Sequence, residues 1–116
     1  EGEKESLIKQ TIGADLLAPL SCHWEVGNAF SAMLNRNRIT LSQAQQAIEA
    51  YRQIRIRFVD VDLMQAVELA HRLGIYAYDA YIIACALGHR CALISLDGGL
   101  VRAAKSAGAE VLEVNE

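Results

Sequence analysis

The sequence predicts an α/β domain with a mostly parallel sheet, formed by the whole chain, residues 1–116. Short apolar segments alternate with helical segments along the chain, which is the pattern of parallel sheets covered by helices. A length of 116 residues fits one domain. A composition that is 53% hydrophobic and 22% charged excludes disorder. No apolar run approaches the roughly 18 residues that a membrane span needs, so no membrane is expected as a partner.

Capping and periodicity place three helices in the first half of the chain. Residues 4–13 have the pattern of a helix end closed by a glycine. Ser21 is a good N-cap for a helix over residues 22–34. Residues 40–43 match the capping box S/T-x-x-E/Q, which opens a helix that runs to about Gln53.

The second half of the chain predicts three more helices. Asp62 caps a helix over residues 63–73. The next helix covers residues 77–87 and is expected to end at Gly88. A last helix covers residues 99–106.

Four short segments between the helices are expected to be strands. Residues 16–18 and 91–95 are apolar runs, and residues 110–114 form the last strand. Residues 54–59 alternate apolar side chains with two arginines, and a charged face favours an edge strand.

Three carboxylates, Glu25, Asp79 and Asp97, are expected to meet at one edge of the sheet. Each lies after a strand or in the first turn of a helix, where the ligand-binding edge of a parallel sheet is formed. Each also has an ordinary explanation, because an acid in a first turn complements the helix dipole and an aspartate before glycines caps or turns the chain. No lysine or arginine stands within their segments, so a hard divalent cation, Mg²⁺ or Mn²⁺, is the expected counter-ion.

A basic segment follows in an otherwise acidic chain. Between residues 35 and 57 five arginines stand against one glutamate, whereas the whole chain has a net charge of −3. Such a segment suits a polyanion, and an ordinary solvated helix face explains it equally well. The arginines expected to contact such a polyanion are Arg36, Arg38, Arg55 and Arg57.

The cysteines and histidines predict no further site. Cys22, Cys85 and Cys91 are an odd, scattered set, which favours reduced thiols in the cytoplasm. The three histidines have no ligand spacing, so a zinc site is not expected.

Three motifs resemble those of the PIN-domain ribonucleases. Trp24-Glu-Val-Gly-Asn-Ala, Tyr78-Asp-Ala and Ser95-Leu-Asp-Gly-Gly-Leu resemble the family patterns E-V-x-N-A, Y-D-A and T/S-x-D-x-x-L. The motifs also resemble those of the bacterial VapC-type toxins of toxin–antitoxin pairs. The resemblance extends over the whole chain.

The resemblance implies a three-layer α/β/α fold and a metal-dependent endoribonuclease that hydrolyses RNA phosphodiester bonds. Glu25, Asp79 and Asp97 would be the catalytic acids and the ligands of Mg²⁺ or Mn²⁺. Asn28 and Ser95 would support the site, or they would serve only as local caps. The implied partners are an RNA substrate, a small antitoxin protein and further copies of the chain in a homodimer or higher oligomer.

The sequence also departs from the family pattern. The family begins with a central strand that ends in a fourth catalytic aspartate, and a helix follows that strand. No such segment stands before Glu25, so we expect the first strand, the first helix and one acid to be missing from this chain. The expected consequences are weak or no RNA cleavage and recruitment of a strand from another copy.

Two other functions are compatible with these residues. A catalytically impaired PIN-like module would only bind RNA or a protein partner. A phosphoryl-accepting receiver domain also binds Mg²⁺ through carboxylates, but it needs a lysine at a late strand end, whereas Lys105 falls within a predicted helix.

Overall fold

A computed structural model describes residues 2–112 and 114 of the chain. Its sheet has two strands, β1 (Leu16–Pro19) and β2 (Ile56–Val59), which run parallel with Leu16 opposite Ile56. The helices are α1 (Gly2–Thr11), α2 (Leu20–Asn35), α3 (Leu41–Arg52), α4 (Leu63–Leu73), α5 (Ala77–His89) and α6 (Gly98–Ser106). The mixed helices and parallel strands confirm the α/β class. None of these described helices has the length and hydropathy that a membrane crossing requires.

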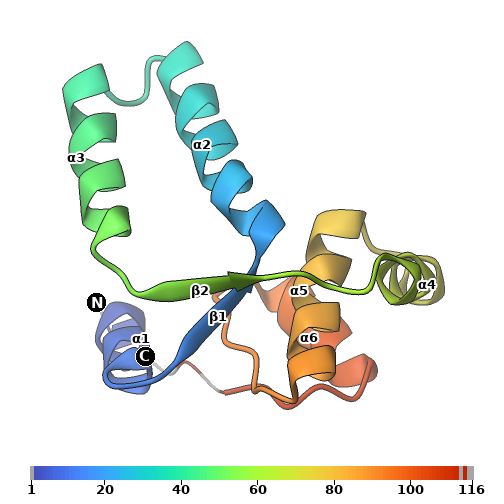
Figure 1. The fold of residues 1–116 in the computed structure, drawn as a ribbon. Coiled ribbons are helices and arrows are strands. Elements are labelled where there is room, and N and C mark those ends of the chain that lie inside the picture. The colour runs from blue at the N-terminus through green and yellow to red at the C-terminus, as the bar shows by residue number, and fades with distance from the viewer. Residues whose placement is uncertain (1, 113, 115–116) are drawn as a thin grey trace.

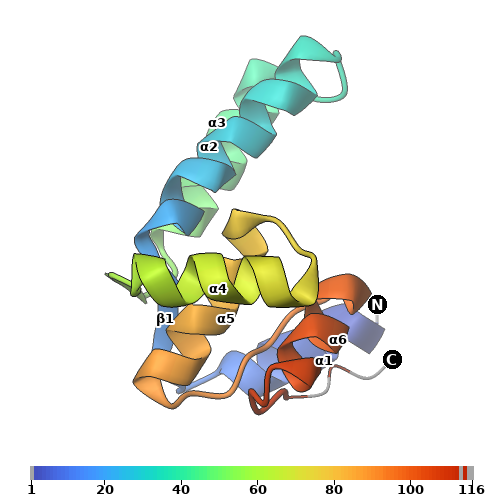
Figure 2. The same cartoon turned by 90° about the vertical axis from the view of Figure 1, so that its right-hand side faces the viewer.

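Two parts of the molecule can be distinguished in Figures 1 and 2. The helices α2 and α3 form an antiparallel hairpin that projects away from the sheet. The helices α4, α5 and α6 form a body on which β1 rests, and α5 contacts both β1 and α4. Because α2 also contacts α5, the base of the hairpin meets the body where β1 ends.

The apolar core lies within this body. Among the described residues, Ile83 of α5 is the largest side chain that is completely buried. The buried core residues are Ala66, Leu69, Ala80, Ile83, Ala84, Ala86, Leu93, Leu100 and Ala104. The core therefore joins α4, α5 and α6 and holds the first turn of α5 beside the base of α2.

The predicted capping of α3 and α4 is confirmed. The backbone N–H of Gln43 donates to Thr40 Oγ1 at 3.1 Å, and the N–H of Thr40 donates to Gln43 Oε1 at 2.9 Å. Asp62 Oδ1 accepts from the N–H groups of Met64 and Gln65 at 3.0 and 3.3 Å. These bonds satisfy donors that the first turn of a helix leaves without partners.

Two predicted helix ends are wrong. Helix α2 starts at Leu20, and its N-cap is the extended Pro19, so Ser21 lies inside the first turn and does not cap it. Helix α5 continues through Gly88 to His89 and ends at Arg90, which has a φ of 56°. A glycine permits a left-handed turn without requiring one, and here the arginine adopts it.

The predicted strands at residues 91–95 and 110–114 are reduced to one parallel bridge between Leu93 and Val111. The N–H of Leu93 donates to the Glu110 carbonyl at 2.8 Å, and the N–H of Leu112 donates to the Leu93 carbonyl at 2.9 Å. Residue 113 lies outside the described residues. A strand forms a ladder by hydrogen bonding to neighbouring strands. Within the described residues the segment 91–95 pairs only with the segment that contains Val111. The predicted edge position of β2 is confirmed, because within the described part of the chain it pairs only with β1.

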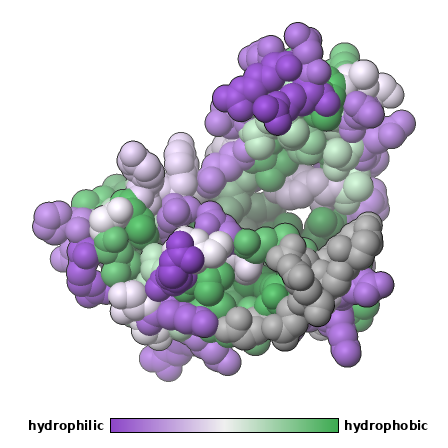
Figure 3. Space-filling model, turned by 180° about the vertical axis from the view of Figure 1, so that it is seen from behind, coloured by the Kyte–Doolittle hydropathy of each residue, from purple (hydrophilic) through white to green (hydrophobic). Residues whose placement is uncertain are grey.

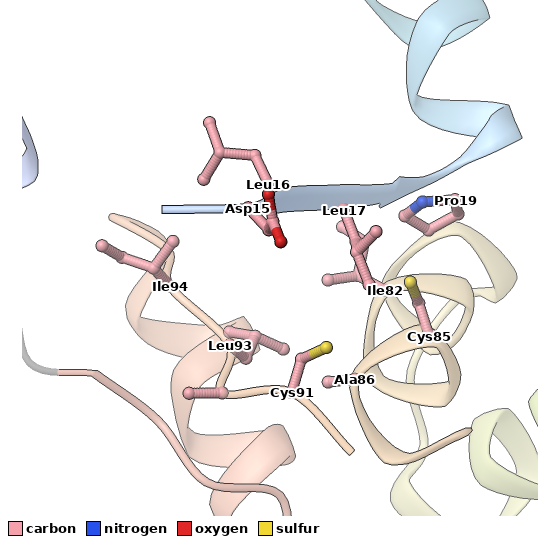
Figure 4. Close-up of a pocket in the computed structure, with 11 residues that line it drawn as sticks. Asp15, Leu16, Leu17, Pro19, Ile82, Cys85, Ala86, Cys91, Leu93 and Ile94 are labelled. Atoms are coloured by element: carbon pink, nitrogen blue, oxygen red, sulfur yellow. The ribbon is translucent and has the colours of Figure 1, made fainter. Parts of the chain in front are cut away.

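A cavity of about 130 Å³ separates β1 from the segment 91–94. Figure 4 shows Leu16 and Leu17 of β1 on one side, Leu93 and Ile94 on another, and Ile82 and Cys85 of α5 along a third side. The N–H and the carbonyl of Leu93 both point toward the segment of Glu110 and Leu112. In an extended chain the N–H and carbonyl groups of the two adjacent residues point the opposite way. Unpaired backbone edges therefore border an apolar cavity.

Unpaired edges of this kind favour association between chains. We therefore expect the protein to self-associate as its concentration rises, as measured by sedimentation velocity between about 5 and 200 µM. Leu17→Lys places a charge in the cavity and is expected to restore the monomer. Met64→Lys on the exposed face of α4 is the control and should leave association unchanged. A folded, single-species monomer at every concentration would contradict the prediction.

Candidate functional site

The helices α2 and α5 bring two of the three predicted acids together. Strand β1 leads directly into α2, which carries Glu25, and Asp79 lies in the first turn of α5. Burial raises the pKa of the Glu25 carboxyl above its usual value, and the negative charge of Asp79 raises it further. The charge of Asp79 therefore makes ionisation of Glu25 less favourable, which is the electrostatic situation that a cation relieves.

A cavity of about 290 Å³ opens beside Glu25. Its lining residues are Ser21, Trp24, Glu25, Asn28, Ala29 and Tyr78. The Ser21 hydroxyl lies near enough to lower the pKa of Glu25 in part, yet Ser21 Oγ and Glu25 Oε2 are both buried without a hydrogen-bond partner. Two buried polar atoms without partners at a cavity wall indicate a position for a polar group or ion.

Asp97 has a local role at the start of α6. Its Oδ1 accepts from the N–H groups of Gly99 and Leu100 at 2.9 and 3.2 Å. The N–H of Asp97 donates to Ser95 Oγ at 3.0 Å, so Ser95 shapes this turn. Among the residues that the structure describes, no three acidic, histidine or cysteine side chains lie together closely enough to hold a metal ion. The structure therefore pairs Glu25 with Asp79 and leaves Asp97 as a helix cap.

Asn28 stands one turn beyond Glu25 on the same face of α2. Its side chain is exposed at the cavity, and its backbone carbonyl accepts from Ser31 Oγ at 2.9 Å. Its amide is thus available to a ligand in the cavity.

The arginines are divided between the two ends of the hairpin. Arg36 and Arg38 are exposed at the tip, about 16 Å along α2 from Glu25. Figure 3 shows this tip as the hydrophilic end of the projecting lobe. Arg55 and Arg57 are exposed beside or on β2, close to the base. The basic segment therefore forms two separate surfaces, one at the tip of the hairpin and one along β2.

An aromatic cluster at the base of the hairpin was not predicted from the sequence. The His23 ring lies 4.8 Å from the ring of Trp24 and 5.3 Å from that of Phe58, and His23 Nδ1 lies 3.1 Å from Tyr51 Oη. Ser21 and Tyr78 were also missed as cavity residues. Ser21 could have been found, because it precedes Glu25 by four residues and so shares its helix face.

Cys22, between Ser21 and the aromatic cluster, has a thiol of low reactivity. Burial, helped by the charge of Glu25, raises the pKa of the Cys22 thiol to about 11. At pH 8 only about one molecule in a thousand carries the reactive thiolate. We expect iodoacetamide at pH 8 to leave Cys22 unmodified in the folded protein and to modify it in urea, as read by mass spectrometry. Rapid labelling of Cys22 in the folded protein would contradict this burial.

The donor set near Glu25 fits a hard divalent ion. Mg²⁺ is commonly bound through one or two carboxylates, with waters and substrate phosphates as the other ligands. Glu25 and Asp79 supply two carboxylates, and Glu25 Oε2 lacks any other partner. Two carboxylates match the number that such an ion commonly takes from a protein.

Paired carboxylates beside the end of a parallel strand are typical of the metal-assisted hydrolases among α/β proteins. The comparison with protein families agrees with this class: the family described as PIN domain matches residues 24–106, which include Glu25, Asp79 and Asp97. The chain belongs to the PIN domain family, whose members are in general nucleases. No curated protein and no solved structure gave a significant match.

Proposed function

We propose that the chain is a divalent-metal-dependent endoribonuclease of the VapC toxin type. The observation that carries the proposal is Glu25 at the cavity wall, with its Oε2 buried and without a hydrogen-bond partner and with the charge of Asp79 acting on it. Membership of the PIN domain family supports hydrolysis of nucleic acid. The motifs described above favour RNA as the substrate.

Each residue of the site would have a separate role in binding the metal ion or the substrate. Glu25 and Asp79 would hold Mg²⁺ or Mn²⁺ at the cavity. Such an ion, when bound, activates water and stabilises charge on the phosphate. Asn28 would donate its amide N–H groups to a phosphate or ribose oxygen. Asp97 stays our predicted third acid, with Ser95 fixing its turn; its Oδ1 is engaged in capping α6.

Cleavage of single-stranded RNA in the presence of Mn²⁺ tests the proposal. We expect cleavage that is slow, abolished by EDTA and lost in Asp79→Ala. Asp97→Asn keeps an oxygen that can cap α6 and removes only the charge, so lost activity with unchanged folding would place Asp97 in the reaction. Cleavage that persists in Asp79→Ala, or that needs no metal, would overturn the assignment.

A second candidate is a PIN-like module that binds RNA or a protein without cutting. The grouping of only two acids, with Asp97 serving as a helix cap, favours this alternative. RNA binding that is not followed by cleavage at any Mg²⁺ or Mn²⁺ concentration would select it.

The partners follow from the toxin assignment. We propose a small antitoxin protein that covers the acidic cavity, a homodimer or higher oligomer, and a cytoplasmic location. Translation of the DNA upstream of the Glu1 codon tests for the family's first strand and its aspartate. A small reading frame beside the gene, whose product co-purifies with the chain and blocks cleavage, would support the toxin role, and its absence would count against that role.

A further inference from the structure

We infer that Trp24 is a stacking platform for an RNA base, with Tyr78 as the facing wall of the same cavity and Arg52 as the contact for a neighbouring phosphate. This inference rests on the proposed function, because it names how the same site would hold its substrate. It assigns a substrate-binding role to Trp24, Tyr78 and Arg52, which have no role in the proposed binding of the metal ion.

The position of Trp24 is the first argument. Its side chain is 68% exposed, although a large aromatic ring gains stability from burial. Trp24 immediately precedes Glu25 and lines the cavity of about 290 Å³ that holds Glu25 and Asn28. A base on this ring would place its own phosphate beside the carboxylate pair.

Support of the rings from behind is the second argument. The His23 ring meets Trp24 at an angle of 76°, and the Tyr81 ring meets Tyr78 at 81°. These edge contacts restrict the two exposed rings while leaving ring surface at the cavity. Tyr78 is itself 55% exposed. Every base has a π face, so rings held in this way bind single-stranded nucleic acid with little dependence on sequence.

The third argument is the positive charge of Arg52, which lines a second cavity beside Trp24. This charge favours nucleic acid over a protein as the partner. Trp24 also lines a second cavity, of about 490 Å³, together with His23, Tyr51 and Arg52. Arg52 is exposed and pairs only loosely with Glu49, at 3.8 Å. Trp24 thus lines both the cavity that holds Arg52 and the cavity that holds Glu25, which suits a chain of alternating bases and phosphates.

Trp24 is the only tryptophan of the chain, so its fluorescence reports this contact directly. The experiment is a titration with oligouridylate in EDTA, where metal-dependent cleavage cannot occur, beside an abasic ribose-phosphate oligomer of equal length. We expect the oligouridylate to quench Trp24 and the abasic oligomer to bind about tenfold more weakly with little quenching.

Variants separate stacking from folding and from charge. By fluorescence anisotropy of labelled RNA, Trp24→Ala and Tyr78→Ala are each expected to weaken binding about tenfold, whereas Trp24→Phe keeps most of it. Tyr76→Ala is the matched control, since Tyr76 is 87% exposed and lies outside the cavity lining. Arg52→Ala should lower the dependence of log K on log salt by about 0.7.

The outcomes distinguish this inference from the proposed function. Equal binding of the abasic oligomer, or unchanged binding by Trp24→Ala, would overturn base stacking even if RNA is cut. Quenching by RNA without any later cleavage would support stacking and count against the nuclease. Quenching that rises with protein concentration in the absence of RNA would show that Trp24 contacts a second copy of the chain, and it would overturn the inference.

Discussion

Replacing Ile83 by alanine is expected to lower the free energy of unfolding by about 2–4 kcal/mol. Ile83 is completely buried in α5, between α4 and α6, and it is the largest side chain so enclosed. The substitution removes apolar contacts and leaves a void in the core that the surrounding structure fills only in part. Since domains of this size are stable by only about 5–15 kcal/mol, the loss should be visible as a large fall in the urea midpoint.

Met64→Ala is the control for this prediction. Met64 lies on the neighbouring helix α4 but is 71% exposed, so its truncation should change stability by less than about 0.5 kcal/mol. Equal effects of the two substitutions would show that the body is not packed around Ile83.

Glu25→Gln is expected to abolish the stabilisation of the protein by Mg²⁺ or Mn²⁺. A ligand that binds only the folded state at a hundred times its Kd stabilises it by about 2.7 kcal/mol. For a domain of about 100 residues this corresponds to a rise of about 10 °C or more in Tm. The substitution removes one of the two grouped carboxylates, so the rise should disappear in differential scanning fluorimetry.

The same substitution has the opposite effect without metal. Burial, joined by the charge of Asp79, raises the folded-state pKa of Glu25 above 4.5. The folded protein then binds the proton more tightly than the unfolded chain, so stability from this group is present below pH 4.5 and is lost as pH rises through the raised pKa. At pH 7 without metal, Glu25→Gln should therefore be at least as stable as the natural protein.

Glu68→Gln is the matched control, because Glu68 is an exposed carboxylate on α4. It should leave both the metal-dependent and the pH-dependent behaviour unchanged. A full metal response in Glu25→Gln would place the ion elsewhere.

The elements that the sequence predicts well are those that depend on neighbouring residues. The capping box at residues 40–43 and the Asp62 cap appear as expected because the bonds are made within three residues. The strand at residues 91–95 depends on partners far along the chain, and local composition cannot supply that information. The end of α5 was misplaced because the choice between Gly88 and Arg90 depends on packing of the last turn.

The candidate site was predictable to a similar extent. The rule that strand ends and helix starts share one edge predicts Glu25 near Asp79, and the charge of Asp79 acts on Glu25, although Glu25 lies beyond the first turn of α2. The same rule does not predict which partner a carboxylate at that edge binds. Asp97 is an example, because its Oδ1 accepts hydrogen bonds from the backbone of α6. The neighbours Trp24 and Arg52 come together only through the return of α3 along α2, which no local pattern shows.

The small side chains of α5 limit which amino-acid substitutions this helix can accept. Ala80 and Ala84 are 0% and 2% exposed, so neighbouring elements approach this helix almost to its backbone. Any larger residue at these positions must push α4 or β1 outward, at a typical cost of 1–3 kcal/mol. Since α5 also carries Asp79 and Tyr78, such a displacement would move the acid pair and the cavity wall together. Variation along this helix is therefore restricted by volume rather than by polarity, and sequences that diverge elsewhere are expected to keep alanine, glycine or serine here.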